Sequence, residues 1–144
     1  MLHRSDFWFF YSLRVRYSEV DQQGVVFNAH YLTYFDVAIT EYMRALNYDY
    51  RSQPERTGTD FHVVKSLVEY KAPIRFDEEI DVGVRTGRLG RTSVSFELAI
   101  FGKDGEELRS LGEIVWVNAD QATHKAARIP PELEALIRMR ENNQ

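Results

Sequence analysis

The chain has 144 residues, 44% of them hydrophobic and 28% charged, which is the size and composition of one globular domain over residues 1–144 rather than of a disordered segment. A net charge of -4 gives no reason to expect a nucleic-acid-binding protein, because such proteins need a basic surface. The absence of cysteine excludes disulfides, thiolate catalysis and cysteine-ligated zinc, and it fits a cytoplasmic location.

The N-terminal part of the chain is predicted to form a strand followed by a loop. Residues 6–11 are aromatic except for Asp6, but this run is too short to span a membrane and is too aromatic for a secretory signal. No other run has membrane length. Over residues 9–17 apolar and polar side chains alternate, with Tyr17 on the apolar face, which predicts a half-buried strand. Residues 18–28 break the alternation, so we expect a loop there.

A long helix is expected to follow this loop. Over residues 29–46 the apolar side chains recur at steps of three and four residues, which is typical of a helix with one broad apolar face. Asn47 is a common residue at a helix end, and the polar residues 48–58 predict a connecting loop. We expect a sheet to wrap around the apolar face of this helix.

The C-terminal half is predicted to contain four strands and a short helix. Lys103-Asp104-Gly105 predicts a hairpin turn, and consecutive strands joined by short turns are antiparallel. The sequence therefore predicts an α+β fold with a five-stranded antiparallel sheet around one helix. Such a sheet leaves exposed edges, so we expect oligomers. The expected ranges are 59–71, 79–88, 92–101 and 106–119 for the strands and 130–140 for the helix.

The densest group of candidate functional residues lies between the first strand and the helix. Asp21 is in the loop, where its carboxylate can activate water or attack a carbonyl carbon. Free backbone N–H groups in the first turn of the helix can bind an oxygen that gains negative charge. Gly24 permits a tight turn and close approach to a ligand. The alternative interpretation is structural, with Asp21 as a turn residue and Asn28 as the helix N-cap.

This segment resembles the hotdog-fold acyl-CoA thioesterases of the 4-hydroxybenzoyl-CoA thioesterase type, including the branch associated with the Tol–Pal envelope system. Those proteins carry Asp, two variable residues, Gly, Val or Ile, Val, an aromatic residue, a polar residue, a small residue, Asn and Tyr. The resemblance continues at residues 40–46 and 70–73 and covers nearly the whole chain. The matching residues here are Asp21, Gly24, Val25, Val26, Phe27, Asn28, Ala29, His30 and Tyr31.

The resemblance implies a hotdog fold, in which a curved five-stranded antiparallel sheet wraps a long central helix and subunits pair with the active site at their junction. Asp21 matches the catalytic carboxylate of the family, acting as base or nucleophile. The backbone N–H of Asn28 matches the group that polarises the thioester carbonyl. The resemblance also implies substrate contacts from Gly24, Phe27, His30 and Tyr31.

The polar residues at the start of the helix depart from the family pattern. Relatives in the Tol–Pal branch tend to have His, a small residue and Asn where this chain has Asn28, Ala29 and His30. Only the N–H role carries over, because it needs no particular side chain. His30 alone is more typical of a packed or capping histidine than of a base. Asp36, on the polar side of the helix, either faces the acyl pocket or is solvated.

Coenzyme A carries several phosphates, so a protein of net charge -4 needs a local positive patch to bind it. The best candidates are Arg85, Arg88 and Arg91, which cluster around a predicted turn between two strands, and Lys65 and Lys71 are weaker candidates. The alternative is that they are ordinary surface arginines on a solvated turn. No spacing of His, Asp and Glu suggests a metal site, and we expect no cofactor.

The sequence therefore predicts an enzyme that hydrolyses acyl-CoA thioesters to the free acid and CoA. A serine hydrolase is disfavoured, because no serine lies in a nucleophile-elbow glycine pattern. The alternatives are a non-catalytic acyl-CoA or acyl-carrier-protein binding protein of the same fold, and an interaction module. A homodimer and a homotetramer both fit this fold. The acyl group, whether aryl, short aliphatic or long aliphatic, stays open.

Overall fold

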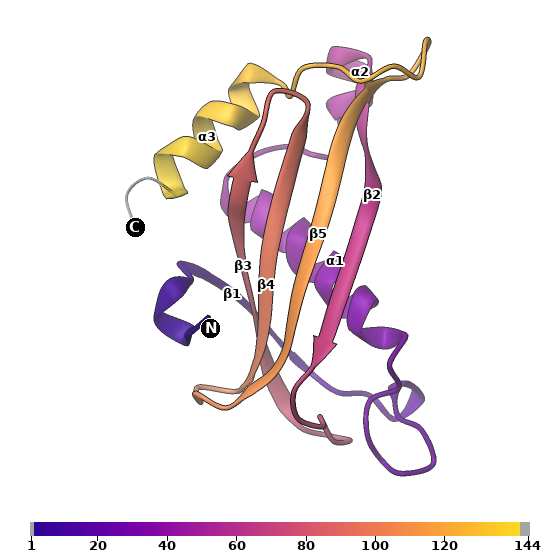
Figure 1. Ribbon diagram of the computed structural model, residues 1–144, viewed down its shortest axis with the longest axis vertical. Helices are drawn as coiled ribbons and strands as arrows, with labels where there is room; N and C mark the ends of the chain where they lie inside the picture. Colours follow the sequence, from indigo (N-terminus) through magenta and orange to yellow (C-terminus); the bar gives the residue numbers. More distant parts are fainter. Residues whose placement is uncertain (1, 142–144) are drawn as a thin grey trace.

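The computed structural model describes residues 2–141, and within them the strands form one antiparallel sheet (Figure 1). The strands are β1 (Phe9–Arg14), β2 (Thr59–Tyr70), β3 (Glu79–Leu89), β4 (Ser93–Gly102) and β5 (Leu108–Asp120). Their order across the sheet is β1-β3-β4-β5-β2, so β1 and β2 are the two edges. This arrangement confirms the predicted α+β fold with a five-stranded antiparallel sheet.

The long helix α1 (His30–Ala45) lies along one face of the sheet (Figure 1). Its observed bounds differ from the predicted range by one residue at each end. Its apolar face is buried against side chains that β3, β4 and β5 direct to the same side, including Val84, Phe96 and Ile114. The buried helix residues are Tyr31, Tyr34, Phe35, Ala38, Ile39, Tyr42 and Met43.

Close contact between α1 and the sheet depends on a glycine in β5. A Cβ atom at Gly112 would lie 2.3 Å from Cε2 of Phe35, a separation that real side chains do not reach. The Phe35 ring is itself fully buried and therefore has little room to move away. Gly112 thus fixes how deeply the helix sits in the concave face.

The first strand is shorter than the sequence predicted. β1 ends at Arg14, which pairs with the first residue of β3, Glu79, so the ladder ends there. The chain then turns into a short 3-10 helix at Tyr17–Glu19, and the Tyr17 side chain is 80% exposed. The expectation that Tyr17 lies on a buried strand face was therefore wrong. No helix within residues 2–141 is long and apolar enough to cross a membrane.

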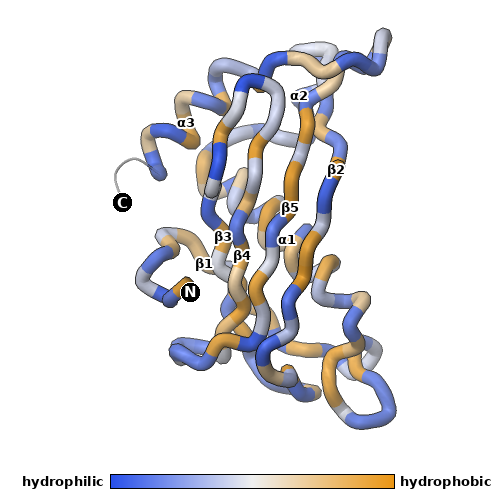
Figure 2. Tube along the Cα trace, viewed as in Figure 1, coloured by the Kyte–Doolittle hydropathy of each residue, from blue (hydrophilic) through white to orange (hydrophobic). Residues whose placement is uncertain are grey.

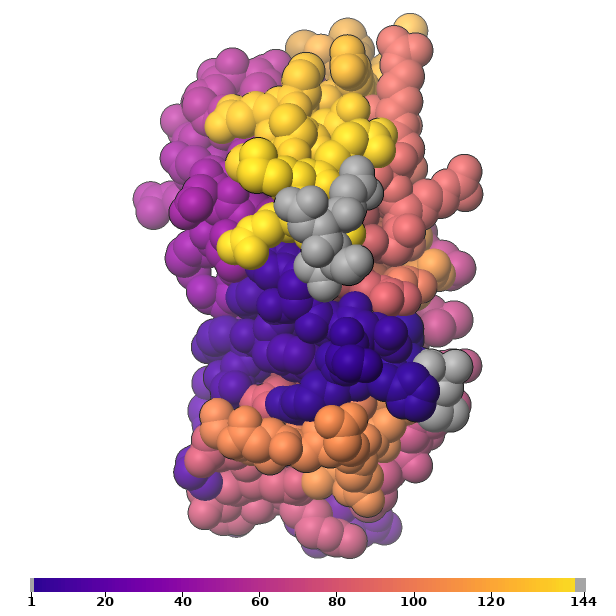
Figure 3. Space-filling view, turned by 90° about the vertical axis from the view of Figure 1, so that its left-hand side faces the viewer, coloured from indigo at the N-terminus to yellow at the C-terminus, as the bar shows by residue number. Residues whose placement is uncertain are grey.

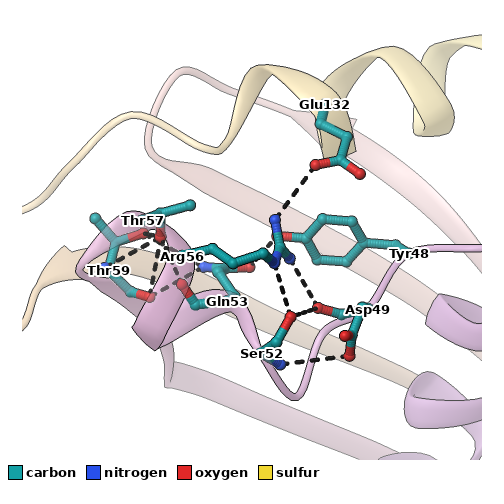
Figure 4. A network of polar contacts seen from close by, with 8 residues as sticks. All are labelled: Tyr48, Asp49, Ser52, Gln53, Arg56, Thr57, Thr59 and Glu132. Carbon is teal, nitrogen blue, oxygen red and sulfur yellow. Dashed lines mark hydrogen bonds and ion pairs between the residues drawn. The ribbon is translucent and has the colours of Figure 1, made fainter.

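The predicted loop at residues 48–58 contains a short helix, α2 (Gln53–Thr57). Five residues are too few to produce a recognisable helical period in the sequence. A polar network holds this helix in position (Figure 4). The Arg56 guanidinium donates to the Ser52 hydroxyl at 2.7 Å and lies 3.3 Å from the Glu132 carboxylate. These contacts connect α2 to the C-terminal helix.

The C-terminal helix α3 (Pro131–Glu141) packs beside β3, and Figure 3 shows it above the N-terminal segment on one side of the molecule. The side chains of Leu133 and Ile137 are fully buried in the core. The Glu141 carboxylate accepts hydrogen bonds from the Tyr42 hydroxyl at 2.7 Å and the Thr86 amide at 2.9 Å. The end of α3 is therefore attached to both the central helix and the sheet.

Strand β2 forms a sheet edge that carries apolar side chains. It pairs with β5 on one side only, with a bulge between Val63 and Lys65. The hydropathy colouring in Figure 2 shows hydrophobic segments along this edge. Exposed fractions here are 56% for Val63, 59% for Val64 and 42% for Leu67. An exposed apolar edge is a typical site of strand pairing with another chain.

Candidate active site

The loop between β1 and α1 is organised around a buried carboxylate. Glu19 is 5% exposed, and its Oε1 accepts hydrogen bonds of 2.8 Å from the Tyr34 hydroxyl and the Arg16 amide. Burial alone would raise the pKa of Glu19, but hydrogen bonds from Arg16 and Tyr34 outweigh it and lower the pKa. The Glu19 carbonyl also accepts the Phe27 amide at 2.9 Å. Glu19 thus connects the two ends of the loop to each other through its carbonyl, and connects the loop to the helix through its carboxylate.

Asp21 lies in a tight turn within this loop. Its Oδ1 accepts the Gln23 amide at 2.8 Å, and its carbonyl accepts the Gly24 amide at 3.0 Å. Gly24 has φ +76°, a left-handed conformation that other residues adopt only with strain. The Asp21 side chain is exposed, and Oδ2 has no hydrogen-bond donor among residues 2–141. The turn interpretation therefore accounts for one carboxylate oxygen and leaves the other available.

The start of α1 presents free donors close in sequence to Asp21. The N-cap is Ala29, and no side chain caps the helix, so the alternative assignment of Asn28 as the N-cap is wrong. The amides of Asn28 and Ala29 donate to no acceptor in the part of the chain that the structure describes. Both residues are exposed. Two free N–H groups at the positive end of a helix can stabilise a carbonyl oxygen that becomes negative.

The remaining candidates from the loop segment lie around the start of the helix. Phe27 is 48% exposed, and its ring centroid is 6.1 Å from that of His30. Tyr31 is buried, and its ring meets the ring of Tyr70 edge-on at 4.8 Å. The Tyr70 hydroxyl donates to the Asn28 carbonyl at 3.3 Å. The last residue of β2 therefore lies directly beside the start of α1.

A groove of about 180 Å³ runs between α1 and β2 from near this point. Its helix residues are spaced four and three apart, so they share one face of α1. Asp36 is among them, which supports the interpretation that this side chain faces a pocket. The apolar periodicity could have indicated Leu32 and Ile39 as pocket residues, whereas sequence reasoning missed Ser66 and Ile114. The lining residues are Leu32, Asp36, Ile39, Val63, Ser66 and Ile114.

The candidate residues Arg88 and Arg91 lie at the opposite end of the chain's long axis from Asp21. The β3–β4 turn and the β1–α1 loop occupy opposite ends of the long axis (Figure 1). Arg88 pairs with Ser95 and is exposed. Arg91 lines a cleft of about 400 Å³ beside α3. A single chain therefore does not bring these arginines together with Asp21.

A cavity of about 370 Å³ lies around the end of α1, lined by residues between Thr40 and Arg51, and none of the candidate residues lines it. Within residues 2–141 no group of three or more His, Asp or Glu side chains is arranged to hold a metal ion.

Comparison with known proteins identifies the family. Residues 23–109 match the family model of the thioesterase superfamily. A putative esterase from Aquifex aeolicus is 30% identical over 67% of this chain and 74% of its own length. The acyl-CoA thioester hydrolase YbgC from Escherichia coli O157:H7 is 29% identical over 88% of this chain and 93% of its own length. The chain belongs to the thioesterase superfamily.

The fold agrees with solved structures of similar sequence. The crystal structure of the PA5185 protein from Pseudomonas aeruginosa PAO1 matches with a TM-score of 0.84 and 29% identity, covering 95% of this chain and 94% of that chain. The sheet wrapped around α1 is therefore the hotdog fold of this superfamily.

Proposed function

We propose that the protein hydrolyses acyl-CoA thioesters to a carboxylic acid and free CoA. The observation that carries this proposal is that one short loop carries both the exposed Asp21 carboxylate and the unpaired amides of Asn28 and Ala29. A carboxylate next to an oxyanion-binding helix end is what acyl transfer to water requires. The similarity to an acyl-CoA thioester hydrolase supports the same substrate class.

The proposed reaction assigns one task to each group. The thioester carbonyl oxygen accepts hydrogen bonds from the Asn28 and Ala29 amides, which stabilise the charge that develops on it. Asp21 either removes a proton from water as the water attacks the carbonyl carbon, or attacks that carbon itself to form an anhydride that water then cleaves. The C–S bond breaks, and the CoA sulfur leaves as a thiolate that takes up a proton.

Within the superfamily we propose that the chain is of the 4-hydroxybenzoyl-CoA thioesterase type, as in the Tol–Pal branch. The support is the Asp21 and Gly24 pattern between the first strand and the helix. The alternative thioesterase pattern has a catalytic Glu on the helix after a His-Gly-Gly run, and this sequence lacks that run. Proposed substrate contacts come from Gly24, Phe27, His30 and Tyr31. The buried Tyr31 ring also packs against Tyr70 at the start of the helix.

The proposed active unit is a dimer in which two β2 strands pair antiparallel. The free edge of β2 and its exposed apolar side chains support this pairing. Val63 and Ser66 of this edge strand also line the groove beside α1, so a second subunit paired with β2 would lie next to the groove. A tetramer could then form from two such dimers.

Asp21 and the arginines are far apart within one chain, but antiparallel pairing of β2 would bring the Asp21 loop of one subunit toward the arginines of the other. The pairing brings the Tyr70 end of one strand to the Thr59 end of the other. The β3–β4 turn lies at the Thr59 end, because the Thr92 carbonyl accepts the Asn118 amide and residue 118 pairs with Phe61. Arg88 and Arg91 of one subunit would therefore serve the Asp21 site of the other.

The test is thiol release from a panel of aryl, short-chain and long-chain acyl-CoAs by the wild type and by Asp21→Asn. We expect kcat to fall about 10³-fold in the variant, while folding and acyl-CoA binding are retained. The matched control is Asp120→Asn, because Asp120 also accepts a backbone amide two residues further on, from Ala122 at 2.8 Å. That variant should keep its activity.

Two outcomes would contradict the proposal. If Asp21→Asn retains the kcat of the wild type on every substrate, Asp21 is not the catalytic carboxylate. If the wild type binds acyl-CoA stoichiometrically and releases no thiol, the protein is a binding protein of the same fold.

A further inference from the structure

Tyr70, the last residue of β2, contacts the start of α1 but has no part in the reaction proposed above. Its hydroxyl donates to the Asn28 carbonyl at 3.3 Å. Its ring meets the ring of Tyr31 edge-on, with an interplanar angle of 81°. Figure 1 shows the end of β2 next to the start of α1. The edge strand is therefore joined to the end of the helix that carries the two unpaired amides.

The carbonyl that Tyr70 contacts belongs to the same peptide group as the Ala29 amide. A peptide group is planar and trans, so its C=O and its N–H point in opposite directions. A donor that holds the Asn28 carbonyl on one side thus fixes the direction in which the Ala29 N–H points on the other side. That N–H is one of the two amides that could stabilise a developing oxyanion.

The two unpaired amides are held in different ways. The Asn28 N–H shares its peptide with the Phe27 carbonyl, which accepts the His30 amide at 3.0 Å. The Asn28 carbonyl, in the next peptide, accepts the Tyr31 amide at the longer distance of 3.3 Å. No side chain caps the helix. The Tyr70 hydroxyl therefore adds a second hydrogen bond to the peptide that the helix backbone holds less closely.

Tyr70 is itself fixed well enough to give this support. Its backbone pairs with Ser110 of β5. The next two amides, of Lys71 and Ala72, donate to the Arg109 carbonyl at 2.8 Å and 3.1 Å. Although the side chain is 55% exposed, its ring rests against a buried ring of α1. The sheet thus positions the hydroxyl independently of the β1–α1 loop.

We infer that Tyr70 is a positioning residue for thioester hydrolysis, an inference that rests on the proposed function. From β2, its hydroxyl holds the peptide between Asn28 and Ala29 so that the Ala29 N–H points at the thioester carbonyl oxygen. Hydrogen bonds in series polarise one another, so the hydroxyl also strengthens the donor at the far side of the peptide. Tyr70 exchanges no proton and contacts no reacting atom in this role.

Loss of this support should lower kcat rather than raise KM. The negative charge on the carbonyl oxygen is larger in the transition state than in the bound substrate, so a misdirected N–H costs more in the transition state. Removal of a whole oxyanion donor lowers kcat by about 10²–10³-fold. A donor that is only misaligned should cost less, so we expect a fall of about tenfold in Tyr70→Phe.

The kinetic test uses Tyr70→Phe, which removes the hydroxyl and keeps the ring contact with Tyr31. Thiol release from one acyl-CoA gives kcat and KM, and thermal unfolding should show unchanged stability. The matched control is Tyr17→Phe. Tyr17 is also exposed, and its ring meets Phe76 edge-on at 5.6 Å, but its hydroxyl has no hydrogen-bond partner among residues 2–141. That variant should keep the kcat of the wild type.

A ketone analogue of the substrate tests the positioning without turnover. In this analogue a methylene group separates the CoA sulfur from the carbonyl carbon, so it cannot be hydrolysed. Infrared difference spectra with ¹³C at the carbonyl report how strongly the bound carbonyl is polarised. Binding to the wild type and to Tyr17→Phe should shift the stretching band to lower frequency, and binding to Tyr70→Phe should shift it less. A residue that only stabilised the fold would not change this band.

The outcomes separate this inference from the proposed function. If Tyr70→Phe keeps the kcat of the wild type, raises KM alone, or retains the full frequency shift, the inference is overturned. If the wild type releases no thiol from any acyl-CoA and leaves the carbonyl band of the analogue unshifted, the proposed function fails instead.

Discussion

The Tyr34 hydroxyl donates a 2.8 Å hydrogen bond to Glu19 Oε1, and both side chains are buried. This bond connects the second turn of α1 to the loop that carries Asp21. The position of the candidate carboxylate relative to the helix start therefore depends on an ionised glutamate that does no chemistry itself. The loop should respond to pH and to changes at Glu19.

Glu19→Gln should destabilise the protein at neutral pH and much less in acid. Because the folded-state pKa of Glu19 lies below its ordinary value of 4.5, its stabilising effect is present above that value and is lost as the pH falls through the folded-state pKa. We expect the variant to lose about 1–3 kcal/mol of unfolding free energy at pH 7, and we expect this difference from the wild type to narrow as the pH falls below the ordinary pKa of a glutamate.

Denaturant unfolding at several pH values measures this gap. Glu41→Gln is the control, because Glu41 pairs with the exposed Arg44 on the surface of α1, and it should cost about 0.5 kcal/mol or less. A gap for Glu19→Gln that stays constant down to acid pH would refute the assigned role.

Gly24→Ala should impair both the loop and turnover. The positive φ of Gly24 costs a residue with a Cβ atom about 1–2 kcal/mol, although no atom lies within 4 Å of such a Cβ. The strain should be relieved by movement of the turn that holds Asp21, so kcat should fall while the fold survives. Thermal unfolding and thiol release measure the two effects. Unchanged kcat would show that the turn geometry is not needed for catalysis.

Val64→Glu should prevent self-association. Val64 lies at the bulge of β2 and is 59% exposed, so a charge there would be buried without a partner when two β2 strands pair. Light scattering after size-exclusion chromatography should show a dimeric or tetrameric wild type and a monomeric variant. Val37→Glu, at an exposed valine of α1, is the control. A wild type that is monomeric at assay concentrations would rule out the proposed active unit.

Gly112→Ala should destabilise the fold by about 1–3 kcal/mol, because the added methyl group collides with the fully buried Phe35 ring. Adding Phe35→Leu should recover part of the loss, since it removes the colliding atoms. Chemical denaturation of the single and double variants gives the coupling. Independent, additive effects would mean that the two residues do not set the depth of the helix.

The sequence predicted those elements whose pattern repeats often enough to be recognised. The central helix and the four C-terminal strands are long, and their predicted bounds agree with the observed bounds to within a few residues. Helix α2 has five residues and is held by polar contacts of the buried Gln53 and of Arg56 with residues outside the helix, so no local period reveals it. The apolar alternation of β1 continues to Tyr17, but the strand ends at Arg14 because its partner strand β3 begins at Glu79. The residues of β1 do not indicate where β3 begins.

The residues of the candidate site could likewise be predicted only in part. Asp21, Gly24 and Asn28 lie within eight residues, so a local motif could indicate them. The closeness of Arg91 to Arg138 could not be predicted from the sequence, because these residues line one cleft only when α3 docks beside the β3–β4 turn. Their distance from Asp21 within one chain follows from strand direction, which sequence spacing does not reveal.

That distance has a genetic consequence. If each site takes its carboxylate from one subunit and its arginines from the other, two alleles with substitutions in different groups can complement each other. A cell expressing both Asp21→Asn and Arg91→Gln would assemble mixed dimers in which both substitutions fall on one site, and the other site would be intact. A dimer made from either variant alone would contain no intact site.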